Sequence, residues 1–147
     1  MPTINVFTIG FTKKNAETFF TKLKNAGVKK LIDIRLNNLS QLSGYAKRDD
    51  LAFFLREICN CEYRYEPLLA PTKEILDDYR KKKIDWSEYE KQFSEIMKNR
   101  EVHTLVNLHE LDNACFLCSE PTAEKCHRRL VTEYLTEHFK NIKISHL

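Results

Sequence analysis

The residues best suited to chemistry lie towards the carboxyl end of the chain. Cys118-Ser119-Glu120 is followed, after a short interval, by Cys126-His127-Arg128. Thiolates act as nucleophiles or metal ligands, carboxylates and imidazoles transfer protons, and guanidinium groups bind anions. This combination predicts a polar site that binds an anionic ligand and carries groups able to act on it.

Two reaction chemistries fit this cluster. In the first, Cys118 or Cys126 is a nucleophile whose thiolate is favoured by neighbouring positive charge or by the start of a helix. In the second, Glu120 and His127 exchange protons with a substrate that arginines hold. The residue types do not decide between them, so the candidate catalytic residues are Cys118, Glu120 and His127.

A zinc site is a third alternative, because the cluster contains a Cys-x-x-Cys spacing and a histidine. Its ligands would be Cys115, Cys118, Cys126 and His127. Residues three apart in an extended strand point to opposite faces of the sheet, so Cys115 and Cys118 would not share one ion. We therefore expect no metal and no other cofactor. Cys115 and Cys126 also fit apolar packing, a common role of free cysteine, and we expect both in the core.

Asp33-Ile34-Arg35 is a second charged group, and it ends a short apolar segment. Alternation along a strand puts Asp33 and Arg35 on the same face. Two charges against a buried sheet are costly unless they pair or lie at an open edge. Two interpretations follow: a structural ion pair, or an arginine that Asp33 orients towards a carboxylate or phosphate. Asp33, Arg35 and Arg128 are therefore candidate ligand-binding residues.

Gly10 ends the first apolar segment of the chain, and Thr12 follows it closely. Glycine allows a sharp turn and a close approach to a ligand, and the next helix would offer N–H groups to an anion. A single glycine at a strand-to-helix turn also has a purely structural explanation. Gly10 and Thr12 join the candidate ligand-binding residues because of their place in the chain.

The elements that position these groups are predicted to form one α/β domain over residues 1–147. Apolar segments alternate with amphipathic ones, which favours a three-layer α/β/α sandwich with a mostly parallel sheet of about five strands. The expected strands cover residues 3–9, 30–34, 62–65, 114–118 and 141–145. The expected helices follow Asn15, Asp49 or Asp50, Thr72, Asp85 and Thr122, with a further helical piece over residues 102–111.

This arrangement predicts where the polar groups meet. Ligands of such sheets bind beyond the carboxyl ends of the strands, so the strand-end residues should gather at one edge. His127 and Arg128 should lie one to two turns into the last helix. The other histidines, among them His103, His138 and His146, show no partner in the sequence and are expected at the surface or at helix ends.

The bulk properties narrow the class of protein. The net charge is +3 with scattered basic residues, which suits a small anionic molecule or a nucleotide more than a coat on nucleic acid, although nucleic-acid binding stays open. Five cysteines, an odd number, favour reduced thiols over a disulfide framework. We expect no membrane span and no secretory signal, and hence a cytoplasmic protein.

The order and spacing of the motifs Thr8-Ile9-Gly10, Asp33-Ile34-Arg35, Cys118-Ser119-Glu120 and Cys126-His127-Arg128 resemble those of the "domain of unknown function 488" family. The resemblance covers nearly the whole chain and implies a compact α/β fold with these motifs on one side. It also implies that Tyr65 and Tyr89 occupy usual aromatic positions. Phe11 and Thr12 depart from the family pattern, which affects the expected substrate more than the expected fold.

Three hypotheses follow. The first is an enzyme-like pocket in which Arg35 and Arg128 hold an anionic or nucleotide-like ligand. The second is a binding module without catalysis, for a nucleotide or nucleic acid, in which Cys118 can be replaced without effect. The third is a buried ion-pair network with a structural role only.

Overall fold

The computed structural model describes residues 3–37, 44–120 and 123–147. Its centre is a five-stranded sheet with the order β3-β2-β4-β1-β5. The strands are β1 (Ile4–Gly10), β2 (Lys30–Asp33), β3 (Glu62–Tyr65), β4 (Ala114–Cys118) and β5 (Ile142–His146). Every neighbouring pair is parallel, which confirms the predicted α/β class.

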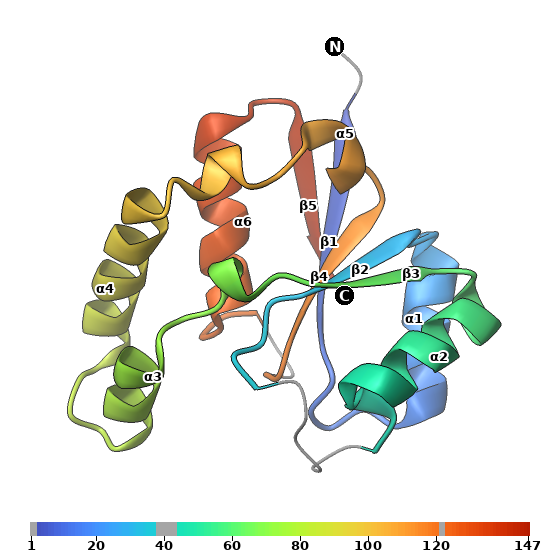
Figure 1. The fold of residues 1–147 in the computed structure, drawn as a ribbon, viewed down its shortest axis with the longest axis horizontal. Helices are drawn as coiled ribbons and strands as arrows, with labels where there is room; N and C mark the ends of the chain where they lie inside the picture. Colours follow the sequence, from blue (N-terminus) through green and yellow to red (C-terminus); the bar gives the residue numbers. More distant parts are fainter. Residues whose placement is uncertain (1–2, 38–43, 121–122) are drawn as a thin grey trace.

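Helices cover both faces of this sheet (Figure 1). Within the described ranges they are α1 (Ala16–Ala26), α2 (Arg48–Cys59), α3 (Lys73–Arg80), α4 (Trp86–Asn99), α5 (Leu108–Leu111) and α6 (His127–His138). Helices α1 and α2 lie on one side, and α3, α4 and α6 on the other (Figure 1). The predicted three layers are therefore present. None of the described helices has the length and apolar character that a membrane span requires.

Strand β4 shows how alternation divides the core into two layers. All five of its residues are buried. Cys115 and Leu117 join the cluster beneath α1 and α2, while Phe116 and Cys118 join the cluster beneath α4 and α6. Cys115 and Cys118 thus point to opposite faces, as the period of two predicts.

Several helix boundaries follow from local chemistry that the sequence displays. The side chains of Asn15, Thr72 and Asp85 each accept a hydrogen bond from a backbone N–H in the first turn of α1, α3 and α4. These caps satisfy N–H groups that have no partner within the helix. Gly27 ends α1 with φ 74°, a left-handed conformation that glycine adopts readily.

Three boundary predictions are wrong. The N-cap of α2 is Lys47, and Asp49 and Asp50 lie in the first turn, where their charge complements the helix dipole. The piece predicted over residues 102–111 divides into a 3₁₀ turn, Val102–Thr104, and the short helix α5, because Asn107 caps a new turn. Helix α6 begins at His127, and the predicted cap Thr122 lies outside the described residues.

The connections create a switch point between the two central strands. Strands β1 and β4 are neighbours, with Gly10 opposite Cys118 at their carboxyl ends. The chain leaves β1 towards α1 on one face, and it leaves β4 towards α6 on the other (Figure 1). Ligands of open α/β sheets bind at such a point, so this edge is where a functional site is expected.

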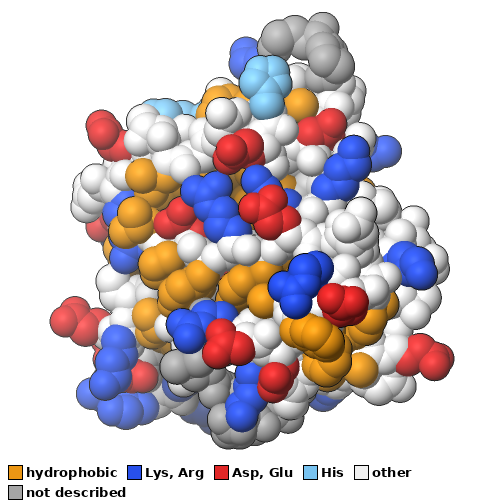
Figure 2. Space-filling view, turned by 45° about the vertical axis from the view of Figure 1, so that its right-hand side comes forward, with side chains coloured by type: hydrophobic (Ala, Val, Ile, Leu, Met, Phe, Trp, Pro, Cys, Tyr) orange, Lys and Arg blue, Asp and Glu red, His pale blue; other side chains and the backbone are white. Residues whose placement is uncertain are grey.

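Charge on the molecular surface is mixed. Figure 2 shows a face on which Lys and Arg side chains lie among Asp and Glu side chains, with hydrophobic side chains between them. On this face the basic residues are scattered, as expected from the sequence.

Candidate functional site

A pocket of about 700 Å³ opens at the carboxyl edge of the sheet. Its floor includes Thr12, Cys118, Cys126 and His127, and its walls come from the loop after β2 and from α3 and α4. The charged side chains that line it are the basic Arg35, Lys73, Arg80 and Lys125 and the acidic Asp77 and Glu120. The lining therefore carries an excess of positive charge, which favours an anionic ligand.

Asp33 and Arg35 form a bidentate ion pair beside this pocket. Arg35 Nε donates to Asp33 Oδ1 at 2.9 Å, and Nη2 donates to Oδ2 at 2.8 Å. Asp33 Oδ2 also accepts a hydrogen bond from the Tyr63 hydroxyl at 2.6 Å. The carboxylate is fully buried and the arginine is 3% exposed, so the guanidinium is held rigidly where it lines the pocket. The ion-pair interpretation is confirmed, and it also leaves Arg35 oriented towards the pocket.

Gly10 is required by the packing around the switch point. A Cβ atom at this position would overlap the backbone carbonyl oxygen of Glu120 and lie 2.6 Å from Nη1 of Arg128. The glycine therefore allows the turn after β4 to cross directly over the end of β1. Gly10 packs against the Glu120 backbone beside the site, and it is not among the residues that line the pocket.

Arg128 is fully buried behind the pocket floor. Its Nη1 donates to the Glu120 carbonyl oxygen at 2.6 Å, and its Nε donates to the Thr8 hydroxyl oxygen at 3.2 Å. Nη2 has no hydrogen-bond partner among the described residues, and none of their carboxylates pairs with this guanidinium. Burial lowers the pKa of Arg128 to about 10, so the group stays positive near neutral pH.

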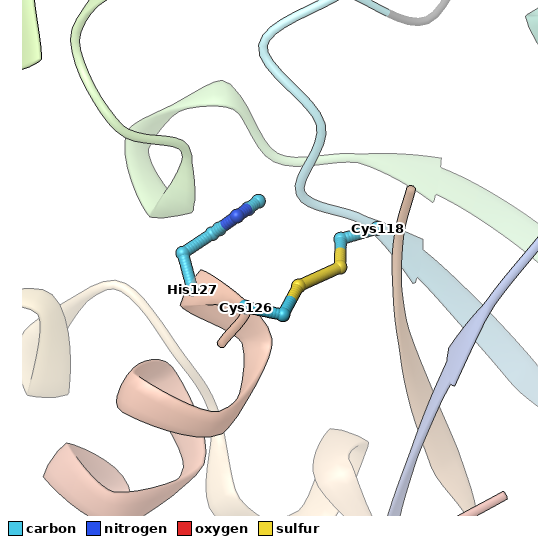
Figure 3. A group of neighbouring side chains, drawn as sticks. All are labelled: Cys118, Cys126 and His127. Carbon is cyan, nitrogen blue, oxygen red and sulfur yellow. A yellow bond between two sulfur atoms is a disulfide. The ribbon is translucent and has the colours of Figure 1, made fainter. Parts of the chain in front are cut away.

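A disulfide joins Cys118 and Cys126, whose Cα atoms lie 7.6 Å apart (Figure 3). Both cysteines are buried, and both sulfur atoms lie near Arg128 Nη1, at 3.3 and 3.8 Å. Within the described residues, Cys59, Cys61 and Cys115 are free. The expectation of five reduced thiols is therefore wrong for this one pair, which lies at the end of β4 and at the residue before α6.

His127 is the first residue of α6, and its ring lies beside the disulfide (Figure 3). Nε2 lies 2.7 Å from the carbonyl oxygen of Ile34. A carbonyl can only accept, so Nε2 carries the proton and the lone pair is on Nδ1. Burial lowers the pKa of His127 to about 4, against a smaller opposing effect of the Ile34 carbonyl. The imidazole is neutral near pH 7.

The predicted site residues thus occupy two layers. Thr12, Arg35, Cys118, Glu120 and His127 line the pocket. A second set lies beneath or beside the lining, namely Gly10, Asp33 and Arg128. The prediction that His127 and Arg128 lie one to two turns into α6 is wrong, because α6 begins at His127. The Glu120 side chain is exposed, and its backbone carbonyl binds Arg128.

Sequence reasoning missed the far wall of the pocket. Trp86 stacks on Tyr89 with ring centroids 4.8 Å apart, and Tyr79 packs against both rings. Burial raises the pKa of Tyr89 well above its ordinary value, so this hydroxyl stays protonated. The sequence displays these aromatic residues as the apolar stripe of a helix, and nothing in it indicates that their edge faces a pocket.

The sequence also gives no indication of the contacts that several histidines make. His146 Nδ1 lies 2.5 Å from the Thr8 hydroxyl, which Arg128 also contacts, and His103 Nδ1 lies 2.8 Å from the Tyr134 hydroxyl. The rings of His103 and His138 stack with centroids 4.3 Å apart. The sequence does not identify these partners, because the contacts come from distant parts of the chain. The predicted location holds for His138, which ends α6, and for His146, both of which are exposed.

A family model described as "Domain of unknown function DUF488" matches residues 15–135. The match covers most of the chain, and the chain therefore belongs to this family. No curated protein and no solved structure matches the chain at a significant level.

Proposed function

We propose that this DUF488 protein binds a small anionic ligand with a flat ring, a nucleotide or a compound of similar chemistry, in the pocket at the carboxyl edge of its sheet. The observation that carries the proposal is the arginine at the pocket. Arg35 is almost fully buried, clamped by both oxygens of Asp33, and still lines the cavity. A guanidinium held in this way is prepared for an anion, because little freedom is lost when the anion binds.

The other walls support the same chemistry. Lys73, Arg80 and Lys125 add positive charge, and the cluster of Trp86, Tyr79 and Tyr89 adds flat apolar surface. A cavity of about 700 Å³ is within the range that small-molecule ligands occupy. A nucleotide combines a negative phosphate with an aromatic ring, and so matches both parts of the lining.

In the disulfide form, binding is the function that this site supports best. The sulfur of Cys118, the candidate nucleophile, is already bonded to Cys126. His127 donates its Nε2 proton to a backbone carbonyl. Catalytic roles for Cys118, Glu120 and His127 remain a prediction for the reduced protein, to be tested by product formation from the bound ligand.

The chain contains a single tryptophan, Trp86, at the pocket wall, and its fluorescence reports binding directly. Titration of the unreduced protein with AMP should change this fluorescence and raise the melting temperature, whereas adenosine and inorganic phosphate should each bind more weakly. Loss of a charge-assisted contact in Arg35→Met should weaken AMP binding at least about tenfold. Arg56→Met, a change on the exposed outer side of α2, should leave it unaltered.

Arg35→Met also leaves Asp33 without its partner, so Arg80→Met provides a second test at an exposed residue of the lining. It should weaken AMP binding several-fold without loss of fold. The proposal is wrong if no nucleotide monophosphate alters Trp86 fluorescence, or if adenosine binds as tightly as AMP.

A further inference from the structure

We propose that, once the disulfide is reduced, Cys118, Cys126 and His127 form a site for a thiophilic divalent cation such as Zn²⁺, with one coordination position open to the pocket. The inference goes beyond the proposed ligand binding and does not depend on it. A phosphine gives two electrons to the S–S bond and becomes a phosphine oxide with oxygen from water, whose two protons complete the two thiols; a thiol reductant gives both electrons and protons and becomes a disulfide. The cation then displaces both thiol protons and binds two thiolates and one imidazole.

The first support is the convergence of three donor atoms. One ligand atom from each of Cys118, Cys126 and His127 lies within 4.8 Å of the other two. Ligands of tetrahedral zinc lie ~2.0–2.3 Å from the ion, and hence roughly 3.5–4 Å from one another. The two sulfurs are bonded to each other in the oxidised form, and a nitrogen of His127 lies within 4.8 Å of both, so all three donors are within reach of one ion once reduction frees the sulfurs.

The second support is the spacing of the two cysteines along the backbone. Their Cα atoms lie 7.6 Å apart, beyond the span of about 4.4–6.8 Å that most disulfides use. The two backbone positions, at the end of β4 and the start of α6, leave room for an ion between the sulfurs. Cys115 cannot take part, because it belongs to the core on the opposite face.

The third support is the orientation of His127. Zinc-binding histidines usually donate their other ring N–H to a carboxylate or backbone carbonyl, which fixes the tautomer and aims the lone pair. Nε2 of His127 makes that bond to the Ile34 carbonyl at 2.7 Å. The lone pair on Nδ1 is left to ligate.

The fourth support is the buried charge of Arg128. This guanidinium has no carboxylate partner among the described residues, yet it lies 3.3 and 3.8 Å from the two sulfur atoms. Metal-bound thiolate sulfurs, which carry much of the negative charge of such a neutral centre, would accept N–H groups from this guanidinium. Arg128 would act as a positioning residue behind the ligands.

The open position distinguishes this arrangement from a purely structural zinc site. All three ligands line the pocket, so the fourth position faces the cavity. Three protein ligands with one open position are typical of zinc that binds water or substrate. A cation there would also attract the anionic group of a pocket ligand.

Cobalt(II) is the probe for this site, because thiolate-bound tetrahedral Co²⁺ has strong visible absorption. The full chain, reduced with a phosphine and kept under argon, should take up one Co²⁺ per chain with that spectrum, and Zn²⁺ should displace it. Cys118→Ser, Cys126→Ser and His127→Gln should each weaken binding at least about 100-fold. Cys59→Ser is the matched control, since Cys59 is free and half-buried at the end of α2, and it should bind like the wild type.

The wild-type protein gives a test that needs no buried substitution. Reoxidation of the reduced protein should abolish Co²⁺ uptake, because the sulfurs then bond to each other. The inference is overturned if reduced wild type shows no thiolate–cobalt absorption, or if binding persists after reoxidation or in both serine variants. Such a failure would leave the AMP titration of the unreduced protein unaffected, so the two proposals can fail separately.

Discussion

The carboxyl edge of the sheet and the layer beneath α1 and α2 give cysteine opposite surroundings. In that layer, Cys61 and Cys115 lie among apolar side chains such as Phe19. Burial, with a smaller contribution from Cys59, raises the pKa of Cys61 to about 12, and burial raises that of Cys115 well above its ordinary value. At the edge, the sulfurs of Cys118 and Cys126 lie beside a guanidinium and border a pocket.

Position in the fold, more than spacing in the sequence, therefore decides what a cysteine can do. Cys115 and Cys118 belong to the same short strand, yet only Cys118 reaches the switch point. There, Cys118 still packs in the cluster beneath α4 and α6, but a buried ion pair, a glycine and the start of α6 lie beside it. We therefore expect substitutions of polar residues at the edge to reduce the free energy of unfolding much more than similar substitutions elsewhere.

The largest effect is expected from Asp33→Asn. This change leaves the buried Arg35 without its counter-charge, and loss of one partner from a buried pair costs about 3–5 kcal/mol of unfolding free energy. Asp49→Asn alters an exposed pair with Arg48 and should cost less than about 1 kcal/mol. Urea denaturation of both variants measures the difference, and equal losses would show that the edge does not depend on this pair.

The next effect is expected from Gly10→Ala. The added methyl group would meet the Glu120 carbonyl, so the turn after β4 must shift, at a cost of about 2–3 kcal/mol. Gly44→Ala is the control, because a Cβ there meets nothing within 4 Å and should change stability by less than about 0.5 kcal/mol. Thermal unfolding compares the stability of the two variants. An unchanged melting temperature in Gly10→Ala would contradict the close approach of the Glu120 carbonyl to the end of β1.

A smaller effect on the free energy of unfolding is expected from pH, through the Cys61 thiol in the apolar layer. The pKa of Cys61 is raised in the folded state, so the native thiol keeps its proton while the unfolded thiol loses it above about pH 9. Stability from this group is therefore fully present below pH 9 and is lost as the pH rises towards 12. Between pH 8 and 10, wild type should lose about 1 kcal/mol relative to Cys61→Ala. Parallel pH profiles for the two proteins would argue against a buried neutral thiol.

Much of the fold was predictable because its signals are local. The strand β4, the caps Asn15 and Asp85, and the left-handed Gly27 each depend on a few adjacent residues. The strand-end rule also placed Arg35 and Cys118 at one edge. The remaining features depend on contacts between distant segments.

Three features of the site were beyond local reasoning. The disulfide joins Cys118 at the end of β4 to Cys126 before α6, a contact that the sequence does not display. Arg128 is buried because it contacts Thr8 and the Glu120 carbonyl, and α6 begins at His127, five residues after the cap expected at Thr122. The aromatic wall depends on how α3 and α4 fold over the edge, and only the tertiary structure places Trp86 there.

The contrast between the two sets of cysteines is tested most directly by pulse alkylation of the reduced protein at pH 7, with each cysteine quantified by mass spectrometry. We predict that Cys118 and Cys126 react at least about tenfold faster than Cys61 and Cys115, because positive charge favours the thiolate at the edge and burial disfavours it in the apolar layer. Zn²⁺ should protect the fast pair. Equal rates for all four cysteines, or faster labelling of Cys61 and Cys115, would contradict this difference between the sheet edge and the apolar layer.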